Sequence, residues 1–479
     1  MGTDLAAQVA RADFFAAHSG SSIDLRWYAG VDQFGYSLVS QAVMATLGVR
    51  LTGALTLVAA AVTFAALLRR TGATRPVPAA LLGVAGLAGN LVSGRVTYGL
   101  GVLFALLALL ALTHPRARPL AAGAALLASA TSPVAGLFLG LAGVALLLTR
   151  RVRGGLLIAG PAAVALALSA AVFSNGGWMN LGHWEAVRAV ATSFVIAALV
   201  PLRPVRAAAV LSAAGVLAAD VFHTPVGLNA TRLVVMFALP VLAGYATVPS
   251  LRHPARLAAL LAAVCCWQSP IVPGDIADIG NPTADPAYFA PLRARLAEAP
   301  LTGRIEIPPT RDYWEAASMG ELPLARGWLR QADIDRNPLF FTTVPGAGGT
   351  GVPLTPATYQ VWLADQAVQF VAVPDARLSW PGEREAALVR GGLPYLTPIW
   401  SSAHWHLYAV TDPRPIVEPP ATLVAQTAST LTFTTPAAGD VRVRVRHHRL
   451  HASGRATVHP DGTWTRVHVP APGRYTLSS

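Results

Sequence analysis

The sequence predicts a polytopic α-helical membrane domain followed by an extracytoplasmic α/β domain and a small C-terminal β-sandwich-like module. Only 13% of the 479 residues are charged, against roughly 25% in soluble domains, and the mean hydropathy is +0.49. Apolar runs fill the sequence up to position 270, and from Ile271 onward charged, aromatic and proline residues are mixed. The expected divisions are an acidic outer segment at 1–35, a transmembrane bundle at 36–270, the α/β domain at 271–414 and the β module at 415–479.

Ten apolar runs are predicted to span the membrane. They lie at 36–68, 76–93, 96–113, 119–131, 134–149, 154–174, 189–200, 206–220, 230–247 and 256–270. Several are shorter than the roughly 20 residues that a straight span needs. Two of them meet at Thr131-Ser132-Pro133. Because proline removes a backbone donor, we expect two short helices or one kinked helix there.

The arginines give these helices an orientation. The formal charge is +12, but much of the arginine excess lies between apolar runs, so we expect no nucleic-acid partner. The clusters are Arg69/Arg70/Arg75, Arg116/Arg118, Arg150/Arg151/Arg153, Arg203/Arg206 and Arg252/Arg256, in alternate loops. The positive-inside rule places these loops in the cytoplasm. It places outside the N-terminal segment, the loops at 93–95, 131–133, 175–188 and 222–229, and everything after Ile271.

The N-terminal segment carries four aspartates within its first 36 residues. An outer position requires either a first helix that inserts with its N-terminus outward or a further helix upstream of Met1. We favour the upstream helix, which would give about eleven spans. Residues 4–17 are predicted to form an amphipathic helix in the membrane interface, with Leu5 and Val9 on its apolar face and Gln8 and Arg11 on its polar face.

The C-terminal part alternates helical and strand patterns. Helices are expected at 287–297, 357–368 and 383–390, and strands at 304–307, 369–373 and 404–410, which is the order of a small α/β domain. Beyond residue 415 only strand and turn patterns remain, with strands expected at 440–446 and 473–476. Arg442, Arg444 and Arg446 share one face of their strand. That face is expected to be solvated or, alternatively, to contact anionic lipid or a cell-wall polymer.

Five motifs carry a resemblance that extends over nearly the whole chain. They are Gly2-Thr3-Asp4-Leu5-Ala6-Ala7, Asp24-Leu25-Arg26-Trp27-Tyr28, Gly94-Arg95-Val96-Thr97-Tyr98, Asn229-Ala230-Thr231-Arg232-Leu233 and Pro323-Leu324-Ala325-Arg326-Gly327-Trp328. In these motifs and in its order of segments the chain resembles the GT-C class of membrane glycosyltransferases. It is more closely similar to actinobacterial polytopic membrane proteins on that plan, some labelled as related to 6-pyruvoyl-tetrahydropterin synthase.

The resemblance implies a function in the bacterial cytoplasmic membrane. A GT-C enzyme transfers a sugar from a polyprenyl-phosphate donor to a cell-envelope glycan or lipid acceptor on the outer face, and uses a carboxylate of the first outer loop. Asp4 matches that position and could take the acceptor's hydroxyl proton, although it could equally cap the helix that follows. Asp13 is the second candidate for the base. The alternative is that Asp13 is a solvated residue on the polar side of the same helix.

Arginines at the outer ends of two runs are the expected ligands of the donor phosphate. Arg95 and Arg232 open spans, with Asn229 just before the second, and an arginine fork suits phosphate. The alternative is that both snorkel to lipid headgroups. Asp24, Arg26, Trp27 and Tyr28 are expected either to contact a sugar or to form a local ion pair beside an interfacial aromatic belt.

His183, Glu185 and His223 are further candidates for acceptor contacts in the outer loops. Their spacing matches no recognised metal pattern, so we expect no cofactor and find no support for a divalent metal. Two other functions remain open. One is a transporter or flippase of lipid-linked envelope precursors, although the sequence shows no convincing internal repeat. The other is a non-catalytic scaffold that displays the C-terminal domain.

Overall fold

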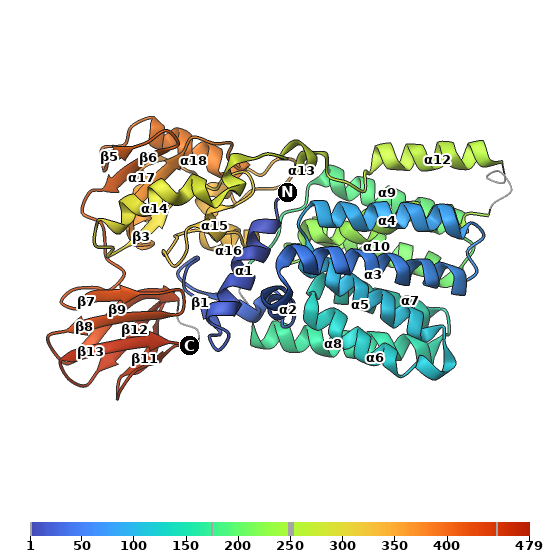
Figure 1. The fold of residues 1–479 in the computed structure, drawn as a ribbon, viewed down its shortest axis with the longest axis horizontal. Helices are drawn as coiled ribbons and strands as arrows, with labels where there is room; N and C mark the ends of the chain where they lie inside the picture. Colours follow the sequence, from blue (N-terminus) through green and yellow to red (C-terminus); the bar gives the residue numbers. More distant parts are fainter. Residues whose placement is uncertain (1, 174–175, 248–252, 447–448) are drawn as a thin grey trace.

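A computed structural model describes residues 2–173, 176–247, 253–446 and 449–479 of the chain. A helical bundle occupies one half of the molecule and small β-sheets with their helices occupy the other (Figure 1). The N-terminal segment, with helix α1 (Leu5–Ala17) and the short strands β1 (Ile23–Asp24) and β2 (Val31–Asp32), lies between the two halves. The chain is therefore mostly helical, and its sheets are separate from the bundle.

Each of the ten apolar runs contains a helix. The helices are α3 (Val49–Arg70), α4 (Pro76–Val92), α5 (Val96–Leu112), α6 (Leu120–Thr131), α7 (Pro133–Leu148), α8 (Val152–Val172), α9 (His183–Leu199), α10 (Arg203–Val221), α11 (Arg232–Tyr245) and α12 (Pro254–Trp267). Within the described residues, four helical segments are long and apolar enough to cross a membrane: Val49–Arg70, Val152–Val172, Arg203–Val221 and Gly227–Tyr245. The remaining apolar helices are shorter.

Two helix breaks follow directly from the sequence. The first run, expected as one long span, is divided into α2 (Ser40–Leu47) and α3 at Gly48, whose φ of 81° is accessible mainly to glycine. The junction at Thr131-Ser132-Pro133 separates α6 from α7, so the two-helix alternative is confirmed. There the Ser132 side chain accepts a hydrogen bond from the Ala135 N–H and caps α7.

Successive bundle helices run in opposite directions (Figure 1). As a result, the loops after α3, α5, α7 and α9, which carry the predicted arginine clusters, lie at the end of the bundle far from the β-sheets. Arg256 belongs to the first turn of α12. Arg252 and residue 175 lie outside the described residues. The charge asymmetry read from the sequence is thus an asymmetry between the two ends of the bundle.

Helix α1 forms as predicted, but its surroundings differ from the expectation. An interfacial helix would expose its polar face, whereas Gln8 is fully buried and Arg11 is only 9% exposed, as buried as Leu5 on the opposite face. Helix α1 packs against α2 on one side and against α15 (Glu315–Ser318) on another. It is therefore an internal helix of this fold, between the bundle and the C-terminal half.

The region from 286 to 410 contains a four-stranded sheet with the order β3-β4-β6-β5. Its strands are β3 (Arg304–Glu306), β4 (Val368–Pro374), β5 (Leu396–Ser401) and β6 (Trp405–Val410). Strand β3 pairs with β4 in parallel, while β4–β6 and β6–β5 are antiparallel. Its principal helices are α14 (Ala290–Ala297), α16 (Arg330–Arg336), α17 (Pro356–Asp365) and α18 (Trp380–Arg390). Strand β5 and helices α15 and α16 were not predicted.

The last 60 or so residues form two facing antiparallel sheets. One has the order β10-β13-β8-β7 and the other β11-β12-β9. Their strands are β7 (Thr422–Gln426), β8 (Thr430–Thr435), β9 (Gly439–Arg446), β10 (His451–Ala452), β11 (Thr457–Asp461), β12 (Trp464–Val469) and β13 (Gly473–Ser478). Inward side chains of both sheets, such as Phe433 and Val443, share one apolar core.

Two of the three arginines of β9, Arg444 and Arg446, are engaged inside the protein, whereas Arg442 is 41% exposed, so the three do not form one free basic face. Arg442 pairs with Asp461 at 3.1 Å. Arg444 is 3% exposed and pairs with Glu418 at 2.6 Å. Arg446 donates from Nε to the Tyr28 carbonyl at 3.0 Å. The last contact fixes the β module to the N-terminal segment.

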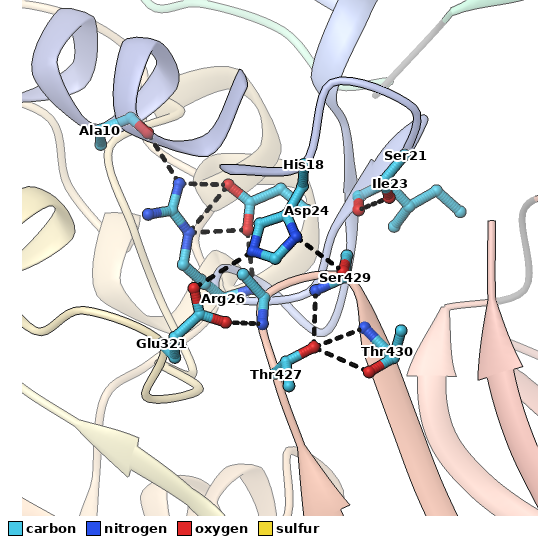
Figure 2. A network of polar contacts seen from close by, with 11 residues as sticks. Ala10, His18, Ser21, Ile23, Asp24, Arg26, Glu321, Thr427, Ser429 and Thr430 are labelled. Carbon is cyan, nitrogen blue, oxygen red and sulfur yellow. Dashed lines mark hydrogen bonds and ion pairs between the residues drawn. The ribbon is translucent and has the colours of Figure 1, made fainter. Parts of the chain in front are cut away.

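A polar network at His18 joins the N-terminal segment to both parts of the C-terminal half (Figure 2). The His18 ring lies 3.2 Å from Glu321 Oε1 through Nε2 and 3.1 Å from Ser429 Oγ through Nδ1. Glu321 Oε2 also accepts a hydrogen bond from the Ala428 N–H. The N-terminal segment is therefore held between the α/β sheet region and the β module.

Candidate functional site

Three of the predicted site residues meet at the N-terminal end of α1. Asp4 Oδ2 lies 3.0 Å from Arg95 Nε and 3.7 Å from Arg232 Nη2. The side chains of Asp4, Arg95 and Arg232 are 13%, 23% and 18% exposed. We call these three residues the Asp4 cluster. Their positions in the sequence are separated by 91 and 137 residues, so the fold itself brings the candidate base and the candidate phosphate ligands together.

The capping alternative for Asp4 is not what the structure contains. Asp4 is the N-cap residue of α1, but its side chain accepts no capping hydrogen bond from that helix. It turns instead to Arg95. An aspartate at a helix start is thus available for an ion pair with other elements.

Close backbone packing places Asp4 against Arg95. The Asp4 N–H donates to the Ser93 carbonyl at 3.1 Å. Gly2 and Gly94 both have positive φ, of 80° and 76°. A Cβ on Gly2 would overlap the Ser93 backbone, and a Cβ on Gly94 would overlap Leu5. Both glycines are therefore required for the contact between the start of α1 and the loop before α5.

The starts of three helices meet at the Asp4 cluster. Asp4 precedes α1, Arg95 precedes α5 and Arg232 is the first residue of α11. The N-terminal end of a helix carries a partial positive charge, although the first N–H groups here are already bonded, such as Asp4 to the Ser93 carbonyl and Arg232 to the Asn229 carbonyl. Two arginines at the starts of three helices therefore create a positive local field, and a single carboxylate offsets it only in part. Such an arrangement favours an anionic ligand.

An apolar cleft begins at Arg95. It lies between α3, α4 and α5 and is narrow, with a cavity volume of about 20 Å³, which is roughly the space of one water molecule. Leu57, Ala60, Leu87, Leu91 and Val96 line it together with Gly53, Thr56, Asn90 and Gly99, and Arg95 is the charged residue among its lining. Its cationic end and aliphatic walls match the chemistry of an amphiphile with an anionic head, but the cleft must widen to admit one.

Aromatic rings border the cluster. The Arg232 guanidinium lies 5.1 Å from the centre of the Tyr98 ring. Tyr36 contacts Trp328 edge to face at 5.6 Å, and Trp328 Nε1 donates to the Thr3 carbonyl at 3.1 Å. The residue Trp328 comes from the C-terminal half of the chain, so that half closes one side of the site.

Asp13 and Asn229 do not join the Asp4 cluster. Asp13 is exposed on α1, roughly two and a half helical turns beyond Asp4. Partial burial raises its pKa above the usual value, against the attraction of Arg26. Asn229 is buried in the 3₁₀ turn Gly227–Thr231 that precedes α11. Asp13 therefore fits the solvated alternative, and Asn229 belongs to the turn that positions Arg232.

The expectation that Asp24, Arg26, Trp27 and Tyr28 contact a sugar is wrong, and so is the interfacial aromatic belt. All four are buried, with exposures of 4%, 6%, 1% and 1%. Arg26 donates to both oxygens of Asp24 and, from Nη2, to the Ala10 carbonyl at 2.8 Å (Figure 2). The local ion pair is thus confirmed, but it serves to fix α1 on β1.

The histidines of the outer loops lie in exposed positions away from the cluster's ion pairs. His183 Nδ1 is 2.8 Å from Asp220. His223 stacks on Trp178 with ring centres 4.0 Å apart. Glu185 is exposed in the first turn of α9. Within the described residues, no three His, Cys, Asp or Glu side chains are arranged to hold a metal ion.

Two sets of buried polar or charged residues were missed as sites. Gln8 and Arg11 continue the face of α1 that bears Asp4, and a reading of the helix as interfacial assigned them to solvent. Arg326, quoted only as part of a motif, contacts Asp333, Glu385 and Glu306 at 2.8, 2.9 and 3.6 Å. All four are at most 2% exposed. In the sequence, only the helical spacing of Gln8 and Arg11 from Asp4, together with their polar character, could have indicated the first set.

Comparison of the chain with protein-family models, curated proteins and solved structures gives no match. The function is therefore inferred from the geometry of the site.

Proposed function

We propose that the protein is an integral membrane glycosyltransferase that takes a sugar from a polyprenyl-phosphate donor and transfers it to a cell-envelope acceptor. The observation that carries the proposal is the Asp4 cluster beside the apolar cleft. A base, two phosphate ligands and a place for a lipid chain are the parts that such a reaction needs. In this proposal all ten apolar helices lie in the bacterial cytoplasmic membrane, and the Asp4 cluster faces outward.

The donor is placed by its two chemical ends. Its phosphate binds Arg95 and Arg232, whose two guanidiniums offer charge-assisted hydrogen bonds. Its isoprenoid chain enters the cleft between α3, α4 and α5, whose aliphatic walls include Leu57 and Leu87 and which widens to admit the chain. Arg95 contributes to both the cluster and the cleft, and this supports a single ligand that spans them.

The contact between Asp4 and the arginines suggests how binding prepares the reaction. Without a donor, the Asp4 carboxylate is the anion that the two guanidiniums hold. A donor phosphate competes for the same guanidiniums and frees Asp4. The released carboxylate then accepts the proton of the acceptor hydroxyl as this oxygen attacks the anomeric carbon. The bond from that carbon to the phosphate oxygen breaks, and the polyprenyl phosphate leaves.

The test is sugar transfer by the purified full-length protein in lipid nanodiscs, supplied with polyprenyl-phosphate-linked sugars and an envelope-lipid extract as acceptor. Asp4→Asn is expected to lower transfer at least roughly a hundredfold, the lower range for loss of a general base, while polyprenyl-phosphate binding persists. Asp220→Asn, which changes an aspartate paired with His183, is the control. Full transfer by Asp4→Asn would show that Asp4 is not the base.

The same experiment separates the alternatives. A protein that binds the lipid phosphate, and moves it between leaflets without transferring sugar, is a flippase. One that neither binds nor transfers is a scaffold. In both cases the proposed chemistry is wrong.

A further inference from the structure

Beyond Asp4, the same face of α1 carries buried donors that lack acceptors. Gln8 and Arg11 follow Asp4 at intervals of four and three residues, so the three side chains share one face of the helix. Gln8 Oε1 accepts a hydrogen bond from the Thr97 hydroxyl at 2.6 Å. In the described residues, however, Gln8 Nε2 and the Nε and Nη2 atoms of Arg11 have no hydrogen-bond partner. Buried donors in proteins are nearly always paired.

Arg11 is the more informative of the two residues. It is 9% exposed, and burial lowers its pKa to about 10. Its guanidinium stacks on the Tyr36 ring at 4.4 Å. The carboxylate of Asp24 attracts it, but both Asp24 oxygens are already held by Arg26. A buried guanidinium is costly unless an anion pairs with it. The described chain supplies no such anion.

Tyr36 connects Arg11 with the Asp4 cluster. The charges of Asp4, Arg95, Arg232 and Arg11 all act on this one side chain. Arg11 therefore adds a third guanidinium to the surroundings of the Asp4 cluster, in which Asp4 is the one carboxylate. The excess of two positive charges exceeds what a single phosphate monoanion neutralises.

We propose that Gln8 and Arg11 form a second oxyanion subsite, which binds an additional acidic group of the ligand that occupies the Asp4 cluster. The chemistry is that of phosphate or carboxylate oxygens, which accept from an amide and a guanidinium together. Two sources fit: the second phosphate of a polyprenyl-diphosphate donor, or an acidic group of the acceptor. The inference rests on the proposed function, because it assigns a second contact to the same ligand.

The first arm of the test compares a polyprenyl monophosphate with the diphosphate of equal chain length. Binding to the full-length protein in nanodiscs is measured by competition with a fluorescent polyprenyl monophosphate. A charge-assisted contact is expected to make the diphosphate bind roughly tenfold more tightly. Arg11→Gln should abolish that preference and leave monophosphate binding unchanged. Arg474→Gln, which removes one exposed charge from β13, is the matched control and should keep the preference.

The second arm examines the acceptor. With the monophosphate bound, the affinity for a uronate-containing oligosaccharide is compared with that for its neutral counterpart. A preference that depends on Arg11 in this arm alone identifies the acceptor as the source, whereas one in the first arm identifies the diphosphate. If Arg11→Gln alters neither preference, while the monophosphate still binds, the subsite is refuted and the proposed function stands. If the unaltered protein binds no polyprenyl phosphate, both proposals fail.

Gln8→Glu tests the subsite without removing an arginine, so its result does not depend on whether the protein folds without Arg11. It places a carboxylate of nearly the same shape beside Arg11 and so fills the subsite from within. We expect a higher unfolding temperature and loss of the preference for the second oxyanion. A Gln8→Glu protein that keeps the preference would overturn the assignment.

Discussion

Two arginine–carboxylate clusters of this protein have opposite designs. In the Asp4 cluster two arginines share one carboxylate, and the side chains are 13–23% exposed. Around Arg326, one guanidinium faces three carboxylates, and no member is more than 2% exposed. The first has surplus cations and access to a cleft, whereas the second has surplus acids and no access. Residue types alone therefore do not identify a binding site: the sign of the surplus charge and its accessibility do.

Protonation relieves the surplus acid at Arg326. Burial and the neighbouring Glu385 charge raise the pKa of Glu306 well above its ordinary value. Burial also raises the pKa of Glu385 to about 7, and Arg326 opposes the rise. A hydrogen bond from the Tyr359 hydroxyl to Glu385, at 2.9 Å, completes the arrangement. We infer that the Arg326 cluster stabilises the fold, and that its variants will alter stability rather than ligand binding.

The largest effect is expected at Arg326. Replacement by methionine leaves Asp333 and Glu385 buried without their cation, so the free energy of unfolding should fall by about 3–5 kcal/mol. Thermal unfolding of the full-length protein measures the change. Arg377→Met removes a 66% exposed partner of Asp278 and should cost less than about 1 kcal/mol. Equal losses of stability in the two variants would contradict the inference that the buried Arg326 cluster stabilises the fold.

The next largest effect is the change of the free energy of unfolding with pH. It tests whether buried acids of the C-terminal half stay protonated, and Glu315 is the residue that reports it. Burial raises the pKa of Glu315 to about 7 from its ordinary 4.5. The fold therefore keeps a proton that the unfolded chain releases, and stability is lost as pH rises between these two values. The change amounts to about 3 kcal/mol. Glu315→Gln should accordingly gain stability relative to the parent between pH 4.5 and pH 7. Glu298→Gln, at a 63% exposed position, should show no such trend.

The change expected for Arg232 is smaller. It concerns the free energy of ligand binding rather than that of unfolding. Arg232→Gln removes one guanidinium from the Asp4 cluster, and polyprenyl-monophosphate affinity should fall roughly tenfold to a hundredfold. Arg95 still pairs with Asp4, so the unfolding temperature should change less than in Arg326→Met. Competition binding in nanodiscs, with Arg474→Gln as control, provides the measurement. An unchanged affinity would contradict the inference that the Asp4 cluster, unlike the Arg326 cluster, binds a ligand.

The smallest effect is expected at Asp13. Because this carboxylate is exposed and outside the Asp4 cluster, Asp13→Asn should change stability by no more than about 0.5 kcal/mol. Sugar transfer should be unaffected. A transfer defect as large as that of Asp4→Asn would reassign the base.

Much of the bundle could be predicted because hydropathy is a local property. The break at Pro133 and the helix within each apolar run were readable from adjacent residues. The break at Gly48 carried a signal too, but an apolar run on both sides obscured it. The positions of Asp4, Arg95 and Arg232 in their helices were also local, and each opens its helix.

Burial of the N-terminal segment could not be predicted in the same way. Tyr28 and Trp27 resemble an interfacial aromatic pair in sequence, yet their cover comes from residues about 290 positions later, such as Ala316 and Gly327. Amphipathicity identified α1 but could not show that its polar face has a protein partner. The solvated reading of Arg444 failed for the same reason, because its partner Glu418 lies on another segment.

The end of the described chain is joined to its beginning. The Ser479 hydroxyl accepts hydrogen bonds from the N–H groups of Ser22 and Ile23, at 3.0 and 3.1 Å, across more than 450 residues. At ordinary rates of synthesis, the ribosome needs on the order of tens of seconds to cover that distance. The strand pair that supports α1 is therefore completed last, after the bundle helices have left the ribosome. The β module is thus the last part of the described chain to dock on the N-terminal segment.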